Sequence, residues 1–276
     1  MPAVKNALAP VFVIALDETA EAPRSLLEQL IQLGFNAQCF QGVDGRTQRP
    51  ELKAPEHIDE TRMQAYVGMA LSNSEIGCYL SHYRCVKAAF DAGLERVCIM
   101  EEDVALEDNF STVLQSLCRE ENSGLEFVRL MGLKKHRRKK IKPLDATTWL
   151  TRPVKGLCGA QGYVLNRSGM EKIIHEAASI WRPIDKMYDQ FWDCDLHCYA
   201  VEPHIIYEQP TPTSIQHAFK PGEVAAPAAN LRRKLQRFGY KTHRSLQRRQ
   251  YMMKHRKAFT PAEKVTGYYG RTSRIR

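Results

Sequence analysis

The feature that most constrains the fold is a strand–helix–strand pattern near the start of the chain. Residues 11–16 are a continuous apolar run, which is typical of a buried strand. In residues 24–33 apolar residues recur at helical spacing, and Gly34 follows as a residue suited to end a helix. Residues 37–43 predict a second strand. Because such a unit places its two strands parallel in one sheet, the pattern predicts an α/β fold.

Strands and helices continue to alternate as far as residue 207. Ser72 and Glu75 have the spacing of a capping box at the start of a helix that reaches residues 92–93. We therefore expect one α/β domain over residues 1–230, with a central, mostly parallel sheet flanked by helices. Further strands are expected at residues 97–100, 126–131, 161–165 and 204–207.

The positive charge of the chain is concentrated at its end. The 276 residues carry a net charge of +9, yet residues 231–276 alone hold 15 basic residues and one acid, a net charge of +14. Residues 1–230 hold 25 basic and 30 acidic residues, a net charge of −5. The chain is thus an acidic body with a basic tail, rather than a uniformly basic protein.

The tail has the pattern of a basic amphipathic helix. Such a helix is typical of binding to an anionic membrane surface, which we expect through residues 231–259. Binding of nucleic acid through the same charge is the alternative. A second basic segment, residues 134–140, predicts a loop that either holds an anionic acceptor or is simply solvated. The apolar row of the tail is Leu231, Leu235, Phe238, Thr242 and Leu246.

Neither the cysteines nor the apolar runs indicate a secreted or membrane-spanning protein. Eight cysteines without a Cys-x-x-Cys pair are typical of reduced thiols in a cytoplasm. The run at residues 6–16 also resembles the core of a signal peptide, but Pro10 interrupts it. We expect a cytoplasmic protein that is peripheral at the inner face of the cytoplasmic membrane.

Three adjacent acids form the most informative motif. The strand at residues 97–100 leads directly into Glu101, Glu102 and Asp103. In an open α/β sheet, ligands bind beyond the carboxyl ends of the strands. Adjacent carboxylates repel one another unless a cation offsets their charge, and oxygen ligands suit Mg²⁺ or Mn²⁺. The motif therefore predicts a divalent-cation site, the alternative being a solvated acidic turn.

A zinc site is a competing hypothesis for the preceding helix. Cys78, His82 and Cys85 have the spacing of one helical face, and a fourth ligand would have to come from residues 194–198. Small residues on such a face also suit close packing of a helix against a sheet.

Several segments, taken in order, resemble glycosyltransferase family 25, the lipopolysaccharide and lipooligosaccharide glycosyltransferases. Any one of them is weak evidence, but six in the order of the family are specific. They cover roughly residues 10–215. The segments are residues 11–16 with Arg24, residues 42–45, residues 75–82, residues 99–104, residues 159–165 and residues 182–185.

The resemblance implies a GT-A-like nucleotide-sugar-binding fold and an inverting, metal-dependent transferase. It implies transfer of a hexose, often galactose, from a nucleotide diphosphate sugar such as a UDP-hexose to a saccharide or glycolipid acceptor. The acidic motif of the family is usually Glu-Asp-Asp, whereas Glu102 is the middle residue here. A domain that binds the donor but has lost transfer through this change is a further alternative, as is a non-enzymatic nucleic-acid-binding protein.

Roles for individual residues follow from the chemistry of the transfer. A carboxylate must take the proton of the acceptor hydroxyl, and we expect Asp185 as this base, with Asp189 second. A helix cap is the alternative role of Asp185. Donor-binding roles are expected for Arg24, Asp44, Glu101 and Asp103, with Glu101, Asp103 and His217 as the metal ligands. Arg24 could instead simply begin a helix, and Asp44 could simply stabilise a turn.

Overall fold

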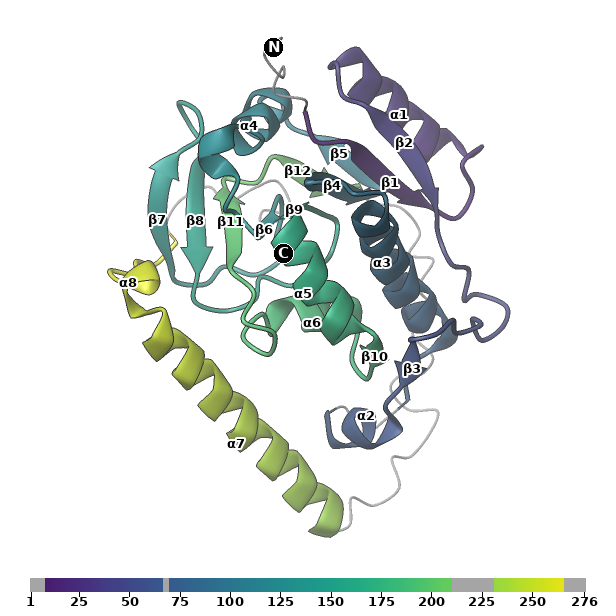
Figure 1. Cartoon of the computed structure of the whole chain (residues 1–276), viewed down its shortest axis with the longest axis vertical. Helices are drawn as coiled ribbons and strands as arrows, with labels where there is room; N and C mark the ends of the chain where they lie inside the picture. Colours follow the sequence, from purple (N-terminus) through teal and green to yellow (C-terminus); the bar gives the residue numbers. More distant parts are fainter. Residues whose placement is uncertain (1–7, 67–69, 210–230, 266–276) are drawn as a thin grey trace.

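The structure, a computed structural model, describes residues 8–66, 70–209 and 231–265. Its centre is an eight-stranded sheet with the order β2-β1-β4-β9-β6-β11-β8-β7 (Figure 1). The strands of this sheet are β1 Val11–Ala15, β2 Ala37–Gln41, β4 Arg96–Glu101, β6 Phe127–Arg129, β7 Arg138–Pro143, β8 Trp149–Pro153, β9 Gly162–Asn166 and β11 Cys198–Glu202.

Short strands pair outside this sheet, and helices cover it. The helices are α1 Glu21–Gln32, α2 Glu60–Tyr66, α3 Asn73–Asp91, α4 Phe110–Leu117, α5 Arg167–Ala177, α6 Ile184–Asp189, α7 Leu231–Lys254 and α8 Arg256–Phe259, with a 3₁₀ turn at Glu120–Asn122. The short strands are β3 His57–Ile58, paired with β10 Ser179–Ile180, and β5 Val104–Leu106, paired with β12 Ile206–Glu208.

The strand–helix–strand unit expected from the sequence is confirmed. β1 pairs with β2 in parallel, with Val11 opposite Ala37, and α1 connects the two strands. Leu26 and Leu30 bury one face of α1, and Gly34 follows the helix with a φ of 85°. A left-handed residue at this position is ordinary for a helix that ends at glycine.

The sheet is mixed, so the expectation of a mostly parallel sheet is wrong. β1 and β4 are parallel, as are β6 and β11, whereas β9 lies antiparallel between β4 and β6. β8 is antiparallel to both of its neighbours, β11 and β7. Strand direction depends on how the chain returns to the sheet, and apolar runs alone do not report it.

Apolar residues on both faces of the sheet are buried. In β1 the alternate residues Phe12 and Ile14 face a core shared with α3, α5 and α6, while Val11 and Val13 face a core shared with α1 and α4. This alternation is the ordinary consequence of the two-residue period of a strand. The sheet therefore holds a helical layer on each face, which leaves the ends of its strands as the place for a polar site.

The N-terminal half of α3 lies directly on the loop that follows β2. Ser72 and Glu75 form the expected capping box, with both hydrogen bonds present. A methyl group added to Gly77 would lie 2.6 Å from the Val43 carbonyl oxygen. The Val43 backbone N–H also donates to the Ser81 hydroxyl at 2.8 Å. This contact fixes the loop that carries Asp44.

Both basic segments are ordered parts of the fold: the expected helix of the tail is confirmed, whereas residues 134–140 differ from the expected loop. Residues 134–140 were expected to form a loop, but Arg138 begins β7, is buried, and pairs with Glu202 at 2.6 Å. The tail begins with α7, which runs along one side of the molecule, while α8 lies beside β7 and β8 (Figure 1). Tyr251 and Phe259 from the tail are buried in the main core. Within the described residues, no helix is both long enough and apolar enough to span a membrane.

A single methyl group tests the contact between α3 and the β2 loop. Gly77→Ala should lower the free energy of unfolding by about 1–3 kcal/mol, because the backbone atoms it meets cannot move aside without displacing the loop. Gly124→Ala is the matched control, since nothing lies within 4 Å of a methyl group there. Urea denaturation measures the free energy of unfolding of both variants. Equal stability of the two variants would contradict the close contact.

Candidate active site

Three carboxylates lie at the carboxyl end of β4. Glu101 is the last residue of this strand, and Glu102 and Asp103 form the turn into β5. β4 is parallel to β1, and β1 is parallel to β2, so these three strands end at the same edge of the sheet. The acids thus occupy the edge at which α/β sheets bind ligands.

A chain of hydrogen bonds holds Glu101 in place. His82 of α3 donates from Nε2 to the Glu101 carboxylate at 3.0 Å. The other ring nitrogen of His82 lies 2.9 Å from the Tyr163 hydroxyl, which in turn lies 2.9 Å from the Tyr188 hydroxyl. Because His82, Tyr163 and Tyr188 are buried, this chain is a fixed link between β4, α3 and α6.

Asp103 is crowded by negative charge and lacks a counter-charge. Burial, together with the charges of Glu101 and Glu208, raises the pKa of Asp103 to about 7. Its buried Oδ1 accepts no hydrogen bond from the part of the chain that the structure describes. A buried carboxylate oxygen without a donor is costly, and a cation would satisfy it. The chemistry of these oxygen ligands fits Mg²⁺ or Mn²⁺.

Asp44 and Arg46 lie on the other side of the acidic turn. Asp44 is exposed and pairs with the Arg46 guanidinium at 2.7 Å. Arg46 also donates its backbone N–H to Asp44 at 2.8 Å, so Asp44 does stabilise a turn. Burial raises the pKa of Glu102, and the charge of Arg46 acts in the opposite direction. Glu102 is therefore close to the Asp44–Arg46 pair.

The two candidate bases occupy α6 and have different surroundings. Asp189 accepts the Cys158 backbone N–H at 3.0 Å and lies 3.7 Å from the Arg129 guanidinium. Asp185 is bound by Lys186 at 2.6 Å and is more exposed, at 24% against 14% for Asp189. Asp189 is thus held by several groups as part of the framework, whereas Asp185 is the more accessible carboxylate. Asp185 does not cap α6, because the cap position is Pro183.

The Cys78 thiol of α3 is affected by charges of both the acidic turn and α6. The main cause of the raised pKa of Cys78 is burial, and the charges of Glu101, Asp185 and Asp103 raise it further. The charges of all three carboxylates thus act on one thiol on α3, and Glu101 lies within 4.8 Å of it. The expected cation ligands and the expected base share one neighbourhood.

Among the described residues, the expected Arg24 is not part of this neighbourhood. Arg24 lies exposed in α1 and forms no side-chain hydrogen bond or ion pair with any described residue. His217 lies outside the described residues. Asp193, a third acid at the same spacing after Asp189, follows the end of α6 and binds Arg182 at 2.6 Å.

The zinc hypothesis does not match the arrangement on α3. Cys85 is fully buried in the apolar core, away from the polar face of the helix. The group that the structure forms is instead Cys78, His82 and Glu101, whose ligand atoms lie within 4.8 Å of one another.

Sequence reasoning missed several residues of the site. Arg46 and Lys186 each follow an expected acid closely, and this spacing was an available signal for a paired charge. Tyr163 and Tyr188 gave no such signal. Their hydroxyls meet only because β9 and α6 pack against each other across the core.

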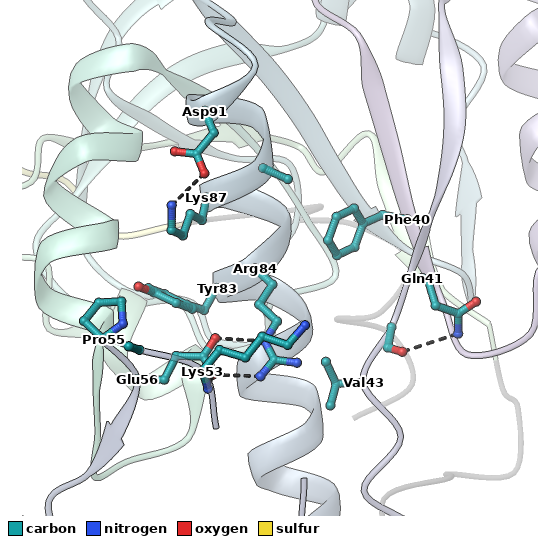
Figure 2. A pocket seen from close by; sticks show the side chains of 13 residues that line it. Phe40, Gln41, Val43, Lys53, Pro55, Glu56, Tyr83, Arg84, Lys87 and Asp91 are labelled. Carbon is teal, nitrogen blue, oxygen red and sulfur yellow. Dashed lines mark hydrogen bonds and ion pairs between the residues drawn. The ribbon is translucent and has the colours of Figure 1, made fainter. Parts of the chain in front are cut away.

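One hollow lies next to the site, not in it. It has a volume of about 620 Å³ and is lined by Phe40, Gly42, Val43 and residues of α3 (Figure 2). Two of its three cations have a carboxylate partner, since Arg84 pairs with Glu56 and Lys87 pairs with Asp91, and Lys53 also lines it (Figure 2). No residue of the acidic turn lines it.

The family of the chain follows from its match to a family model. Residues 8–188 match the model described as glycosyltransferase family 25 (LPS biosynthesis protein). The chain belongs to glycosyltransferase family 25. This match includes the β2 loop, the acidic turn and α6 as far as Tyr188.

Curated relatives of this family 25 chain include both inactive proteins and galactosyltransferases. It is 27% identical over 218 residues to "Probable inactive glycosyltransferase 25 family member 3" of Rattus norvegicus, covering 70% of this chain and 37% of the relative. It is 26% identical over 221 residues to "Procollagen galactosyltransferase 1" of Danio rerio, covering 71% and 36%. It is 24% identical over 220 residues to "Procollagen galactosyltransferase 2" of Homo sapiens, covering 71% of this chain and 34% of the relative.

The chain thus spans little more than a third of the length of these relatives. Among solved structures, "Crystal Structure of A197 from STIV" aligns with a TM-score of 0.38 and 13% identity, covering 76% of this chain and 99% of that chain. This similarity is too low to support an assignment of fold.

The raised pKa of Asp103 predicts a pH-dependent stability. Because the folded state raises the pKa of this acid to about 7, folding is favoured while Asp103 is protonated. Stability should fall as the pH rises from about 4 to about 7, and level off above. Between pH 5.5 and pH 8, we expect the wild type to lose on the order of 5 °C more in Tm than Asp103→Asn.

Differential scanning fluorimetry without metal, and then with Mn²⁺ at pH 8, measures this effect. Mn²⁺ should restore the Tm of the wild type but not that of Asp103→Asn. Asp91→Asn, at an exposed position of α3, is the matched control and should behave as the wild type. Identical pH profiles for the wild type and Asp103→Asn would show that Asp103 is not a buried, crowded acid.

Proposed function

We propose that this chain is a metal-dependent, inverting hexosyltransferase that uses a nucleotide diphosphate sugar as donor. The observation that carries the proposal is the acidic turn at the carboxyl end of β4, where Glu101 ends the strand and the buried Oδ1 of Asp103 has no hydrogen-bond donor among the described residues. The charges of both acids and of Asp185 act on the Cys78 thiol, which connects the turn electrostatically with α6. A cation site and an accessible carboxylate are the two groups that glycosyl transfer to a hydroxyl requires. The family match supports a glycosyltransferase.

The donor side of the site is the edge formed by β1, β2 and β4. Glu101 and Asp103 would hold the divalent cation, and the orphaned Oδ1 of Asp103 is available to it. When bound, such a cation offsets the negative charge that develops on the leaving diphosphate. The exposed Asp44, beside Arg46, would bind the ribose or the base of the nucleotide. Two roles stay predictions: Arg24 would bind a phosphate of the donor, and His217 would be a third metal ligand.

Asp185 is the proposed base on the acceptor side. It would take the proton of the acceptor hydroxyl as the hydroxyl oxygen bonds to the anomeric carbon and the bond from that carbon to the diphosphate breaks. Inversion requires the acceptor to approach from the face opposite the diphosphate. Lys186 holds the Asp185 carboxylate, and although burial opposes it, the hydrogen bond to Asp185 raises the pKa of Lys186. Asp189 is the second candidate.

Activity, rather than donor binding alone, is supported by the residues of this chain. The relatives named above include proteins called inactive as well as galactosyltransferases. If Glu101 and Asp103 are the ligands, Glu102 is not needed for the metal, and the Leu16 backbone and the charge of Arg46 stabilise its carboxylate instead. The Glu-Glu-Asp sequence is then compatible with transfer.

The sugar, the acceptor and the fold family are inferred from the relatives. The galactosyltransferases among them favour galactose as the hexose. The family description favours a lipopolysaccharide-type acceptor, whereas the named animal enzymes act on procollagen. A GT-A-like fold is compatible with the mixed, helix-covered sheet.

Substitutions at the three acids test the proposed activity. Asp103→Asn should lower hydrolysis of UDP-galactose, and its transfer, by at least about 100-fold, since the cation loses a charged ligand. Asp185→Asn should lower transfer by about 100-fold or more while nucleotide binding persists. Asp189→Asn should mainly lower stability. Release of UDP, with Mn²⁺ and with Mg²⁺, is the measurement.

Asp91→Asn again serves as the control that removes one exposed carboxylate. Full activity of Asp103→Asn would contradict the metal assignment, and full activity of Asp185→Asn would contradict its role as base. Binding of UDP-galactose by the wild type without any turnover would support the donor-binding, inactive alternative.

We further propose that the chain works at an anionic membrane surface, from the cytoplasmic side. α7 packs against the body through Tyr240, which contacts Tyr66 and Trp181, and through Tyr251. At 100° per residue, the exposed apolar residues of α7 fall within an arc of about 80° on the opposite side of the helix. They are Leu235, Phe238, Leu246 and Met253, exposed by 51–77%.

The free face of α7 is therefore an apolar row on a basic helix, as in helices that lie at membrane surfaces. Deleting the tail would uncover the core around Tyr251, so substitution is the better test. Leu235→Gln with Phe238→Gln should reduce sedimentation with phosphatidylglycerol vesicles about tenfold and leave the Tm unchanged. Unchanged sedimentation, or RNA binding without vesicle binding, would contradict the membrane proposal.

A further inference from the structure

A second hollow brings together the two basic segments of the sequence. It has a volume of about 520 Å³ and lies between α7, α8 and the outer strands of the sheet. Arg137 comes from the first basic segment, while Arg248, Arg249 and Arg256 come from the tail more than 100 residues later. We call this hollow the arginine groove.

The charges of the arginine groove are not neutralised by the protein. Arg248, Arg249 and Arg256 form no side-chain hydrogen bond or ion pair with the residues that the structure describes, and no acid lines the groove. Arg137 donates to the Ala262 carbonyl oxygen. The hollow in Figure 2 differs in this respect, because its Arg84 and Lys87 each have a carboxylate partner. Four guanidinium groups in one hollow repel one another unless an anion joins them.

The rest of the groove is apolar. Val154, Met252, Met253 and Phe259 line it alongside the arginines. Phe259 is buried, whereas Met253 is 77% exposed and lies on the same side of α7 as Leu235 and Leu246. The groove is thus continuous with the free apolar face of α7. Methionine adapts its shape to irregular apolar partners, and an alkyl chain is one such partner.

We propose that the arginine groove binds the phosphate group of a single anionic phospholipid, with the start of its acyl chain against Met252, Met253 and Phe259. Guanidinium groups are the residues of choice for phosphate, which they bind through paired hydrogen bonds. An anion without an alkyl part would leave the apolar lining exposed, and an uncharged lipid would leave the arginines unpaired. The inference rests on the proposed membrane location and adds a specific headgroup site to it.

The position of the groove suits an enzyme with a membrane-bound acceptor. His136 belongs to the first basic segment and is adjacent in sequence to Arg137, which lines the groove. Burial and the charges of Lys155, Lys134 and Arg248 lower the pKa of His136, while the charge of Asp189 acts in the opposite direction. The charges of Arg248, which lines the groove, and of Asp189, which ends α6, thus act on the same imidazole.

A charge-matched pair of variants of the full chain tests the groove. Arg248→Gln with Arg256→Gln removes two charges that line it, and Lys241→Gln with Lys257→Gln removes two exposed charges of the tail that do not. Vesicles with 30% phosphatidylglycerol in phosphatidylcholine are the first probe. We expect the groove pair to lose on the order of tenfold or more in vesicle affinity, and the control pair about threefold or less.

Soluble ligands separate a lipid site from a simple anion site. Dihexanoylphosphatidylglycerol below its micelle concentration should bind the wild type, and glycerol phosphate or inorganic phosphate should not displace it at equal concentration. Equal losses in the two variant pairs would overturn the proposal, as would displacement by inorganic phosphate. Release of UDP in solution should be unchanged in both variant pairs. A result against the lipid site is therefore distinguishable from a result against the proposed transferase activity.

Discussion

Repulsion among three adjacent carboxylates is the constraint on which the proposed site depends. β4 brings Glu101, Glu102 and Asp103 to the edge of the sheet, and the core behind them prevents full hydration. Each acid meets this constraint differently: Glu101 accepts a hydrogen bond from His82, Glu102 lies toward Arg46, and Asp103 has its pKa raised to about 7. A divalent cation would offset the repulsion that remains, so the acidic turn is unfavourable when empty and favourable when the cation is bound.

One helix, α3, positions every part of this site. Its first turns lie on the β2 loop through Gly77 and Ser81, which fixes Asp44. Its next turn presents His82 to Glu101 and, through Tyr163, connects to Tyr188 on α6. Asp185 lies on the same short helix as Tyr188. Donor loop, acidic turn and proposed base are therefore set by a single rigid element, so a disturbance of α3 reaches all three.

Local patterns predicted the local structure, and partners distant in sequence account for what was missed. The strand–helix–strand unit and the Ser72–Glu75 capping box depend on neighbouring residues, and both are present. Residues 134–140 have the composition of a loop, but Arg138 is ordered by Glu202, 64 residues away. The helical row of the tail was visible, yet which face packs depends on Tyr66 and Trp181. Likewise, the acidic turn was apparent from sequence, but the raised pKa of Asp103 comes first from its burial in the fold, then from Glu101 and the distant Glu208.

The most direct test of this account is the position of the metal. Crystals grown with Mn²⁺ and UDP, and measured at the manganese absorption edge, would locate the ion by its anomalous signal. The account predicts one strong peak at coordination distance, about 2.1 Å, from carboxylate oxygens of Asp103 and Glu101. A fully occupied manganese and diphosphate elsewhere, with no density at the end of β4, would contradict it.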